Sequence, residues 1–286
     1  MAKFHFEKGH MVPVPSHSII PERDLGNVPV LECSHLGIQF GGLKAVDDFN
    51  LTIGRTEIAG LIGPNGAGKT TVFNLLTKVY QPTMGTILLN GQDTSGKDTA
   101  HINRMGIART FQNIRLFNNL SVEDNVKIGL HNHNRYSMAS GVLRLPSFWK
   151  QEKAAHERAM ELLSIFHMED LADHKAGSLP YGAQRRLEIV RALATDPSLL
   201  LLDEPAAGMN PQETEELGEF IKDIQKKFGL TIFMIEHHMN LVMGISDRIY
   251  VIDFGKQIAQ GTPAEVQNNP AVIAAYLGVD EEEGVQ

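Results

Sequence analysis

Short apolar runs recur near both ends of the chain and predict buried β-strands. Each run has the length of a strand and is rich in leucine, isoleucine and valine. Continuous apolar runs of this kind suit strands that are buried on both faces of a parallel sheet. The predicted strands are Ile58–Ile62, Leu199–Leu202, Thr231–Ile235 and Arg248–Ile252.

Helical patterns separate the later strands. Pro211–Phe228 and His238–Ile245 are the predicted helices. Because the strands alternate with helices, right-handed parallel crossovers are expected. Farther along, Thr262-Pro263-Ala264-Glu265 combines a capping threonine, a proline at the first helical position and a glutamate two residues later. This combination predicts the start of a short helix.

The region around residues 30–90 has a different pattern. Leu31–Phe40 and Ala45–Ile53 alternate between apolar and polar positions, which predicts two antiparallel strands joined by a turn at Gly41-Gly42. A helix is predicted from about Gly68 to Val79, and Thr86–Leu89 is a further short strand. The pattern therefore indicates an antiparallel unit beside the parallel sheet.

The middle of the chain, about 111–195, is predicted to be helical. Ser121 with Asp124 three residues later is a capping pattern for a helix that starts there. Gln151–Phe166 has helical spacing, whereas Asn132–Trp149 is predicted to be an irregular insertion. The result is an α/β sheet core interrupted by a helical lobe.

Composition and charge narrow the class of protein. Of the 286 residues, 42% are hydrophobic and 21% are charged, which is ordinary for a soluble globular protein. No apolar run approaches the roughly 18 residues of a membrane span, and no secretory signal pattern is present. The single cysteine, Cys33, excludes a disulfide framework, and His131 and His133 are interpreted as solvated side chains. A net charge of −8 argues against a nucleic-acid partner.

A glycine-rich loop follows the first predicted parallel strand. Gly63-Pro64-Asn65-Gly66-Ala67-Gly68-Lys69-Thr70 matches the phosphate-loop pattern G-x-x-x-x-G-K-[ST]. Glycines allow backbone N–H groups to wrap a polyphosphate, and the following helix points its N-terminus at the anion. Lys69 adds positive charge at the outer phosphates, and the Thr70 hydroxyl is a magnesium ligand.

An acidic pair ends the second parallel strand. Asp203 and Glu204 follow Leu199–Leu202, so the strand delivers both to the carboxyl edge of the sheet, where ligands of open α/β sheets bind. Asp203 is expected to hold magnesium, and Glu204 to polarise the attacking water as a general base. The third strand ends near His237, and all three groups are expected to converge at one edge.

A segment upstream of Asp203 resembles a known family motif. Leu179–Ile189, with the sequence LPYGAQRRLEI, resembles the LSGGQ signature of ABC ATPases. The stretch from about 30 to 278 looks like the ATPase subunit of bacterial branched-chain amino acid importers. The most similar pieces are Phe40–Val46, Glu204–Gly208 and Ala275–Gly278. The lipopolysaccharide-export ATPase shares some of these pieces and is kept as an alternative.

The resemblance implies roles for further residues. Phe40 matches the aromatic residue that stacks on adenine, although a core phenylalanine is the alternative at such a position. Gln112 matches the glutamine that touches magnesium or the attacking water, and His237 matches the switch histidine near the terminal phosphate. Asn210 falls in the loop that communicates across the dimer. The implied ATP-binding residues are Phe40, Gly63, Pro64, Asn65, Gly66, Ala67, Gly68, Lys69, Thr70, Thr71, Gly182 and Gln184.

The chain departs from the family pattern at several positions. Pro180 replaces the signature serine and supplies neither a hydroxyl nor an N–H group. Tyr181 replaces a glycine, Asn210 stands where many ABC proteins carry aspartate, and His238 stands where these importers usually carry an acid. Because Lys69 and the acids remain, ATP hydrolysis is still predicted, with Gly182 and the helix N-terminus near Tyr181 as the anion-binding group.

The resemblance also implies an architecture. The fold class is a P-loop NTPase of the RecA-like type, a mixed sheet core with an antiparallel β subdomain and an inserted α-helical lobe. The proline-interrupted residues 1–29 form an extension, 30–278 form the ATPase domain and 279–286 form an acidic tail. Within the domain, 30–110 and 196–278 form the nucleotide-binding core and 111–195 the helical lobe with the signature.

The resemblance implies an ATP site to which two ATPase chains each contribute residues, and the expected partners follow from this. ATP with Mg²⁺ would bind between two identical or paralogous ATPase chains, and transmembrane permease subunits would couple to them, with a periplasmic binding protein acting indirectly. This places the chain on the cytoplasmic face of the inner membrane. The rivals are a non-transport ABC ATPase, a P-loop kinase or GTPase-like switch, and a module that holds ATP without turnover. The absence of a long coiled coil or second cassette disfavours the first, and Glu204 disfavours the last.

Overall fold

The computed structural model describes residues 28–130 and 146–277. Most of the 1–29 extension, the paired histidines His131 and His133, the insertion up to residue 145 and the acidic tail lie outside the described residues. The chain divides into two compact units: residues up to 107 together with those from 198 onward, and residues 108–197.

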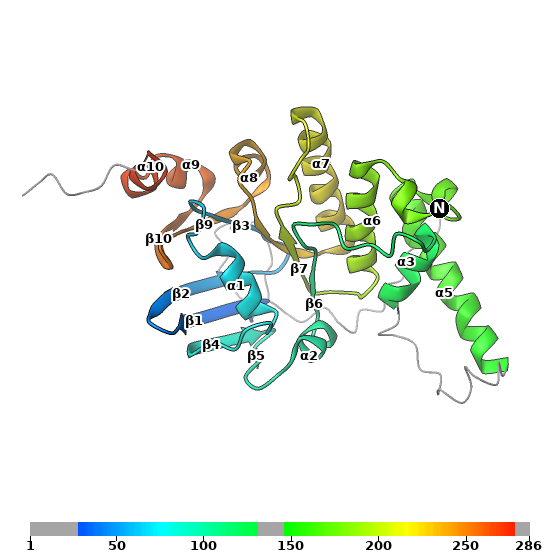
Figure 1. The fold of residues 1–286 in the computed structure, drawn as a ribbon, viewed down its shortest axis with the longest axis horizontal. Helices are drawn as coiled ribbons and strands as arrows, with labels where there is room; N and C mark the ends of the chain where they lie inside the picture. Colours follow the sequence, from blue (N-terminus) through cyan, green and yellow to red (C-terminus); the bar gives the residue numbers. More distant parts are fainter. Residues whose placement is uncertain (1–27, 131–145, 278–286) are drawn as a thin grey trace, which may run out of the picture. The chain divides into compact units, whose positions relative to one another are not determined.

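The first unit contains an antiparallel sheet (Figure 1). Its strand order is β2-β1-β4-β5. The bounds are β1 Leu31–Phe40, β2 Leu43–Ile53, β4 Met84–Leu89 and β5 Gln92–Asp93. β1 pairs with β2 through a turn at the predicted position, with Phe40 opposite Leu43. The two predicted antiparallel strands are therefore confirmed, and β5 is an additional short strand that the sequence pattern did not reveal.

A six-stranded mixed sheet has the order β10-β9-β3-β8-β7-β6. Its strands are β3 Ile58–Ile62, β6 Ile107–Arg109, β7 Leu199–Asp203, β8 Thr231–Ile235, β9 Arg248–Asp253 and β10 Lys256–Gly261. β3, β7, β8 and β9 run parallel, and β10 is antiparallel to β9. All residues of β3, β7 and β8 are buried, as continuous apolar runs predict.

The first unit also contains helices. They are α1 Lys69–Leu76, α2 Thr99–Arg104, α7 Pro211–Phe228, α8 Met239–Ile245, α9 Pro263–Gln267 and α10 Pro270–Leu277. Phe73 of α1 packs in one core with strands of both sheets, and its ring lies 5.2 Å from that of Phe233 in β8. Val242 of α8 and Val266 of α9 pack with β3 and β9 in a second cluster.

Two helices in the first unit begin with the same capping chemistry. Thr262 caps α9 and Asn210 caps α7, each as a capping box with the glutamate three residues later and a proline at the start of the helix. The predicted start of the helix at Thr262 is therefore confirmed, and a glycine in the left-handed conformation, Gly229, ends α7. These local signals explain why both boundaries could be read from the sequence.

The second unit is helical. Its elements are α3 Val122–Gly129, α5 Pro146–Ile165, the short 3₁₀ helices η2 Glu169–Leu171 and η3 Ala176–Ser178, and α6 Tyr181–Leu193. The Ser121 hydroxyl accepts the Asp124 N–H, which confirms the predicted cap of α3. The prediction of an irregular insertion was wrong for residues 146–149, because α5 begins at Pro146, a residue that fits the first turn of a helix.

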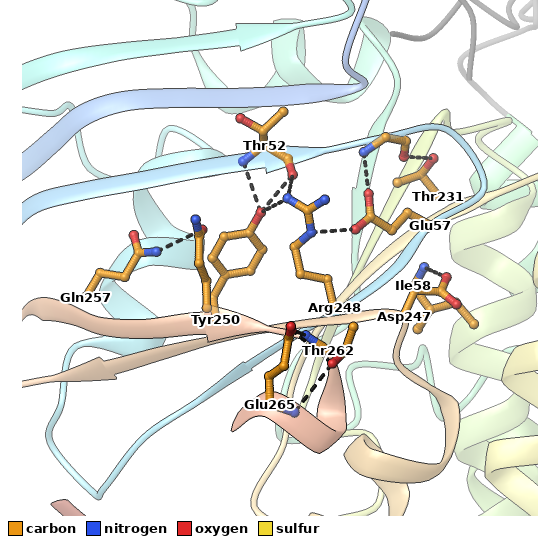
Figure 2. A network of polar contacts seen from close by, with 12 residues as sticks. Thr52, Glu57, Ile58, Thr231, Asp247, Arg248, Tyr250, Gln257, Thr262 and Glu265 are labelled. Carbon is orange, nitrogen blue, oxygen red and sulfur yellow. Dashed lines mark hydrogen bonds and ion pairs between the residues drawn. The ribbon is translucent and has the colours of Figure 1, made fainter. Parts of the chain in front are cut away.

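A buried polar network lies at the amino edge of the parallel strands (Figure 2). Arg248 Nε lies 3.0 Å from Glu57 Oε1, and Glu57 Oε2 accepts the Gly54 N–H at 2.7 Å. The Tyr250 hydroxyl donates to the Thr52 carbonyl at 2.7 Å, and burial raises the pKa of this phenol. The network therefore fixes the starts of β3 and β9 against the end of β2.

No helix in the described parts of the chain is long and apolar enough to cross a membrane. The predicted mixed sheet with an antiparallel β subdomain and a helical lobe is confirmed.

Candidate functional site

The phosphate loop connects β3 to α1, as the sequence predicted. Gly63 opens it, and a Cβ at this position would lie 2.0 Å from the carbonyl oxygen of Ile252. Gly68 closes it as the N-cap of α1 with φ of 107°, where a Cβ would lie 2.7 Å from the Ala45 carbonyl oxygen. Close approach of neighbouring backbone therefore requires glycine at both ends of the loop.

Neighbouring elements fix the loop in place. The Gly255 N–H, in the turn between β9 and β10, donates to the Ala67 carbonyl at 2.9 Å, and the Gly255 carbonyl accepts the Asp47 N–H of β2 at 2.8 Å. The backbone of Gly63 also hydrogen-bonds to the Tyr276 hydroxyl of α10, and burial raises the pKa of that phenol to about 12. The loop is thus held by strands and by the last described helix.

Lys69 begins α1 and turns back over the loop. Its Nζ donates to the carbonyls of Gly63 at 2.7 Å and Pro64 at 2.8 Å. Burial lowers the pKa of Lys69, and the nearby Glu204 carboxylate acts in the opposite direction. A buried ammonium that is held by two carbonyls at a helix N-terminus is suited to bind an anion with several oxygens.

Glu204 follows β7 in an uncommon backbone conformation. Its φ is 48°, and its N–H donates to the Ile235 carbonyl of β8 at 2.9 Å. Its Oε1 lies 2.8 Å from Nε2 of His237, which follows β8. The Glu204 side chain is 16% exposed and that of His237 is 38% exposed, so solvent or a ligand can reach the pair. Left-handed backbone at a bulky residue is a cost that often marks a functional position.

Asp203 and Thr70 offer oxygen ligands for a cation. Asp203 is the last residue of β7 and is 4% exposed, and Thr70 is the second residue of α1. In the described residues, no group of three or more His, Cys, Asp or Glu side chains is arranged to hold a metal ion. A single carboxylate with a hydroxyl nevertheless fits Mg²⁺, which keeps several waters and takes its other ligands from phosphates.

A second glutamate, Glu236, is buried behind His237. Its Oε1 accepts the Ala206 N–H at 2.7 Å, and its Oε2 accepts the N–H groups of His237 at 2.8 Å and His238 at 3.0 Å. The ring Nδ1 of His238 lies 3.0 Å from the same Oε2. This contact gives a role to the histidine that stands where an acid was expected from the resemblance.

Phe40 lies at the end of β1 and is 45% exposed. Its ring meets that of Tyr80 edge-on, with ring centres 5.2 Å apart. An exposed aromatic ring with one edge-on neighbour keeps a face available for stacking. The alternative interpretation of Phe40 as a core residue is not favoured by this exposure.

Gln112 belongs to the second unit, and the backbone around it is bound to α6. The Arg185 guanidinium donates to the carbonyls of Phe111 at 2.7 Å and Gln112 at 2.8 Å, and also to Glu188 Oε2 at 2.9 Å. Glu188 Oε1 accepts the Arg115 N–H at 3.0 Å. The Arg185 and Glu188 side chains are both buried, so this ion pair holds the segment that carries Gln112 rigidly against α6.

The signature segment forms the N-terminus of the same helix. Pro180 is the N-cap of α6 and has no side chain able to accept a backbone N–H, and no atom lies within 4 Å of a Cβ at Gly182. The Gln184 Nε2 donates to the Leu179 carbonyl at 2.8 Å, so this amide is used within the segment. Space beside Gly182 at a positive helix end suits an anion.

The structure brings together most of the predicted residues of the first unit. Lys69, Glu204 and His237 meet at the carboxyl edge of β3, β7 and β8, as expected from the parallel strands. Gln112, Gly182 and Gln184 lie in the second unit. Sequence reasoning missed three buried charged residues, Glu236, Arg185 and Glu188. The available signal was a charged residue within an apolar pattern, as in Ile235-Glu236 and Leu187-Glu188-Ile189.

The chain is similar to known proteins over most of its length. A family model described as ABC transporter matches residues 46–207, and one described as branched-chain amino acid ATP-binding cassette transporter matches residues 256–282. The chain is 50% identical over 250 residues to the high-affinity branched-chain amino acid transport ATP-binding protein LivG of Escherichia coli (strain K12), covering 87% of this chain and 98% of that protein.

More distant relatives share the same cassette. The lipopolysaccharide export system ATP-binding protein LptB of the same strain is 34% identical over 250 residues, covering 87% of this chain and 98% of LptB. A crystal structure of an ATP-binding cassette of an ABC transporter in its ADP conformation matches with a TM-score of 0.76 at 29% identity, covering 88% of this chain and 99% of that chain. The chain therefore belongs to the family of ABC transporter ATP-binding subunits, ATPases that couple ATP hydrolysis to transport.

Proposed function

We propose that this chain drives an importer of branched-chain or related amino acids. The transport class follows from the family, and the substrate is supported by two observations. Identity is 50% to a branched-chain amino acid transport protein and 34% to a lipopolysaccharide export protein, over 250 residues in each case. In addition, the family model that matches residues 256–282 is described for branched-chain amino acid cassettes. The export alternative is therefore disfavoured.

The phosphate loop is proposed to bind the outer phosphates of ATP. Lys69 Nζ would exchange its carbonyl partners, Gly63 and Pro64, for phosphate oxygens, and the backbone of residues 63–71 would supply N–H donors. Phe40 would stack on adenine with the ring face that Tyr80 leaves uncovered. Both interactions use groups that the fold already holds in position.

Magnesium is proposed to enter with the nucleotide. Thr70 and Asp203 would hold it, and the family resemblance implies Gln112 as a further ligand. The ion would neutralise charge on the phosphates, which is the contribution that magnesium makes to phosphoryl transfer. Mg²⁺ commonly takes its remaining ligands from waters and from the phosphates of the bound nucleotide.

Glu204 is proposed as the general base, and this role depends most on its contact with His237. The carboxylate accepts a proton from water while the water oxygen bonds to the γ-phosphorus and the bond from that phosphorus to the bridging oxygen breaks, which releases ADP and phosphate. His237, 2.8 Å from Glu204, would orient the carboxylate and contact the terminal phosphate. The single observation that carries this mechanism is the Glu204–His237 pair beside Lys69.

The chain is proposed to work as a dimer of identical or paralogous ATPases. The Gly182 end of α6 in one chain would meet the nucleotide bound to the loop of its twin, because a helix N-terminus with open space favours an anion. ATP would close the dimer and hydrolysis would open it, a population shift between two states. Transmembrane permease subunits would couple to the segment around Gln112 at the cytoplasmic face of the inner membrane, and a periplasmic binding protein would act indirectly.

The test is magnesium-dependent ATP hydrolysis by the chain with its transmembrane subunits reconstituted in lipid vesicles. Glu204→Gln should lower kcat by about a thousandfold, because general-base catalysis contributes roughly 10²–10⁴-fold, while ATP binding remains. Lys69→Ala should lose ATP binding itself. Uptake of leucine into wild-type vesicles, compared with an unrelated amino acid, tests the substrate class. Wild-type turnover in Glu204→Gln would refute the assigned base.

A further inference from the structure

The proposed function assigns no role to Glu236. Its side chain is 1% exposed, and its two oxygens accept hydrogen bonds from segments that carry or adjoin a proposed catalytic group. Oε1 holds the backbone of Ala206, two residues beyond Glu204. Oε2 holds the backbone of His237 and of His238. One carboxylate thus joins the segment after β7 to the segment after β8.

The surroundings require a group that only accepts hydrogen bonds. The backbone contacts are three N–H donors, and they approach both oxygens of Glu236. An ionised carboxylate accepts at both oxygens, whereas an amide side chain carries donors at one end. In Glu236→Gln, the NH₂ group must therefore face either Ala206 N–H or the N–H groups of the two histidines. Either orientation leaves donor facing donor in a buried place.

His238 complements this carboxylate. Its ring Nδ1 is 3.0 Å from Glu236 Oε2, and its side chain is 45% exposed. A ring nitrogen that donates to the carboxylate fixes the tautomer and adds a fourth donor to the same group. The two histidines after β8 therefore have different partners: His237 contacts Glu204, and His238 contacts Glu236.

We propose that Glu236 is a positioning residue for ATP hydrolysis, which holds the Glu204 and His237 segments at the spacing that their contact requires. The inference rests on the proposed roles of Glu204 and His237. The 2.8 Å contact between these two side chains depends on the relative position of two separate loops, and Glu236 bonds to the backbone of both. Misplacement of a reacting group by about 1 Å can cost on the order of a hundredfold in rate.

The experiment measures kcat and KM for ATP in the reconstituted transporter, with Glu236→Gln compared with Glu57→Gln. Glu57 is the matched control, because it is also a buried glutamate that accepts a backbone N–H, at the opposite edge of the sheet. Rates are taken well below the melting temperature of each variant. We expect Glu236→Gln to lower kcat at least tenfold with KM within about twofold of wild type, because the phosphate loop is not bonded to Glu236. Glu57→Gln should lower only the melting temperature.

A double variant separates positioning from general weakening. In a His237→Ala background, Glu236→Gln should lower kcat by less than about threefold, since the Glu204–His237 contact whose spacing it sets is already lost and contacting residues are not additive. An equal loss in both backgrounds, or a change in melting temperature without a change in kcat, overturns the inference. If His237→Ala itself has wild-type kcat, the assigned role of His237 in the proposed function fails instead. The two failures are therefore distinguishable.

Discussion

The two edges of the parallel strands are built for different purposes. At the amino edge, Glu57 pairs with Arg248, and Tyr250 donates to a backbone carbonyl, so buried charges and hydroxyls meet partners of the fold (Figure 2). At the carboxyl edge, Lys69 holds backbone carbonyls that a phosphate would replace, and Glu204 adopts left-handed backbone. The parallel sheet thus has a stabilising network at its amino edge and an exchangeable one at its carboxyl edge.

The difference follows from the direction of the strands. Because β3, β7 and β8 are parallel, their carboxyl ends share one edge, and the N-terminus of α1 arrives there with its unsatisfied N–H groups. The amino ends carry no such positive helix terminus and can be closed by side chains. The contacts that a ligand can replace are therefore located at the carboxyl edge.

The largest effect expected from this comparison is a loss of ATP affinity when Gly63, at the carboxyl edge, is replaced. Gly63→Ala places a methyl group against the Ile252 carbonyl oxygen, 2.0 Å from the ideal Cβ position, so the loop must shift away from β9. We expect ATP affinity to fall by about a hundredfold or more, consistent with the cost of misplacing a binding group. Equilibrium binding of a fluorescent ATP analogue measures this.

Gly244→Ala in α8 is the matched control for that substitution. No atom lies within 4 Å of a Cβ at Gly244, and its φ is not positive. Its affinity for the analogue should equal that of the wild type. Equal affinities in Gly63→Ala and Gly244→Ala would mean that the close approach to Ile252 does not constrain the loop.

A substitution at the amino edge should lower stability and leave ATP affinity unchanged. Arg248→Met leaves the buried Glu57 carboxylate without its ion-pair partner, so the free energy of unfolding should fall by about 3 kcal/mol. ATP affinity below the melting temperature should not change, because Arg248 lies at the other end of β9 from the phosphate loop. Urea unfolding and ATP binding on the same preparation test both halves. A loss of affinity without a loss of stability would remove the contrast between the edges.

The smallest expected effect concerns Tyr250. Tyr250→Phe removes a buried hydrogen bond to the Thr52 carbonyl and should cost about 1 kcal/mol at neutral pH. Burial raises the pKa of the folded phenol above its ordinary value of 10.0, so its contribution to stability is present below pH 10 and is lost as pH rises through the folded pKa. The wild type should therefore lose stability above pH 10 more steeply than Tyr250→Phe. Parallel pH dependences of thermal unfolding would contradict this assignment.

Local patterns predicted much of the fold. The apolar run of β3 and the capping signals at Thr262 and Ser121 act between residues within a turn of each other, so their structural consequence can be read without a partner. The short elements β5, β6 and α2 were missed because segments this brief carry no measurable period. The start of α5 at Pro146 was missed although its signal was present.

The sequence by itself determined which chemistry this protein can perform. The phosphate loop, the acids after β7 and the histidine after β8 are each local motifs, and parallel strands place their ends at one edge. Only the tertiary structure decided how the groups meet, since Glu204 finds His237 and Glu236 finds Ala206 across more than one element. Such pairings depend on strand order and register, and no local periodicity carries that information.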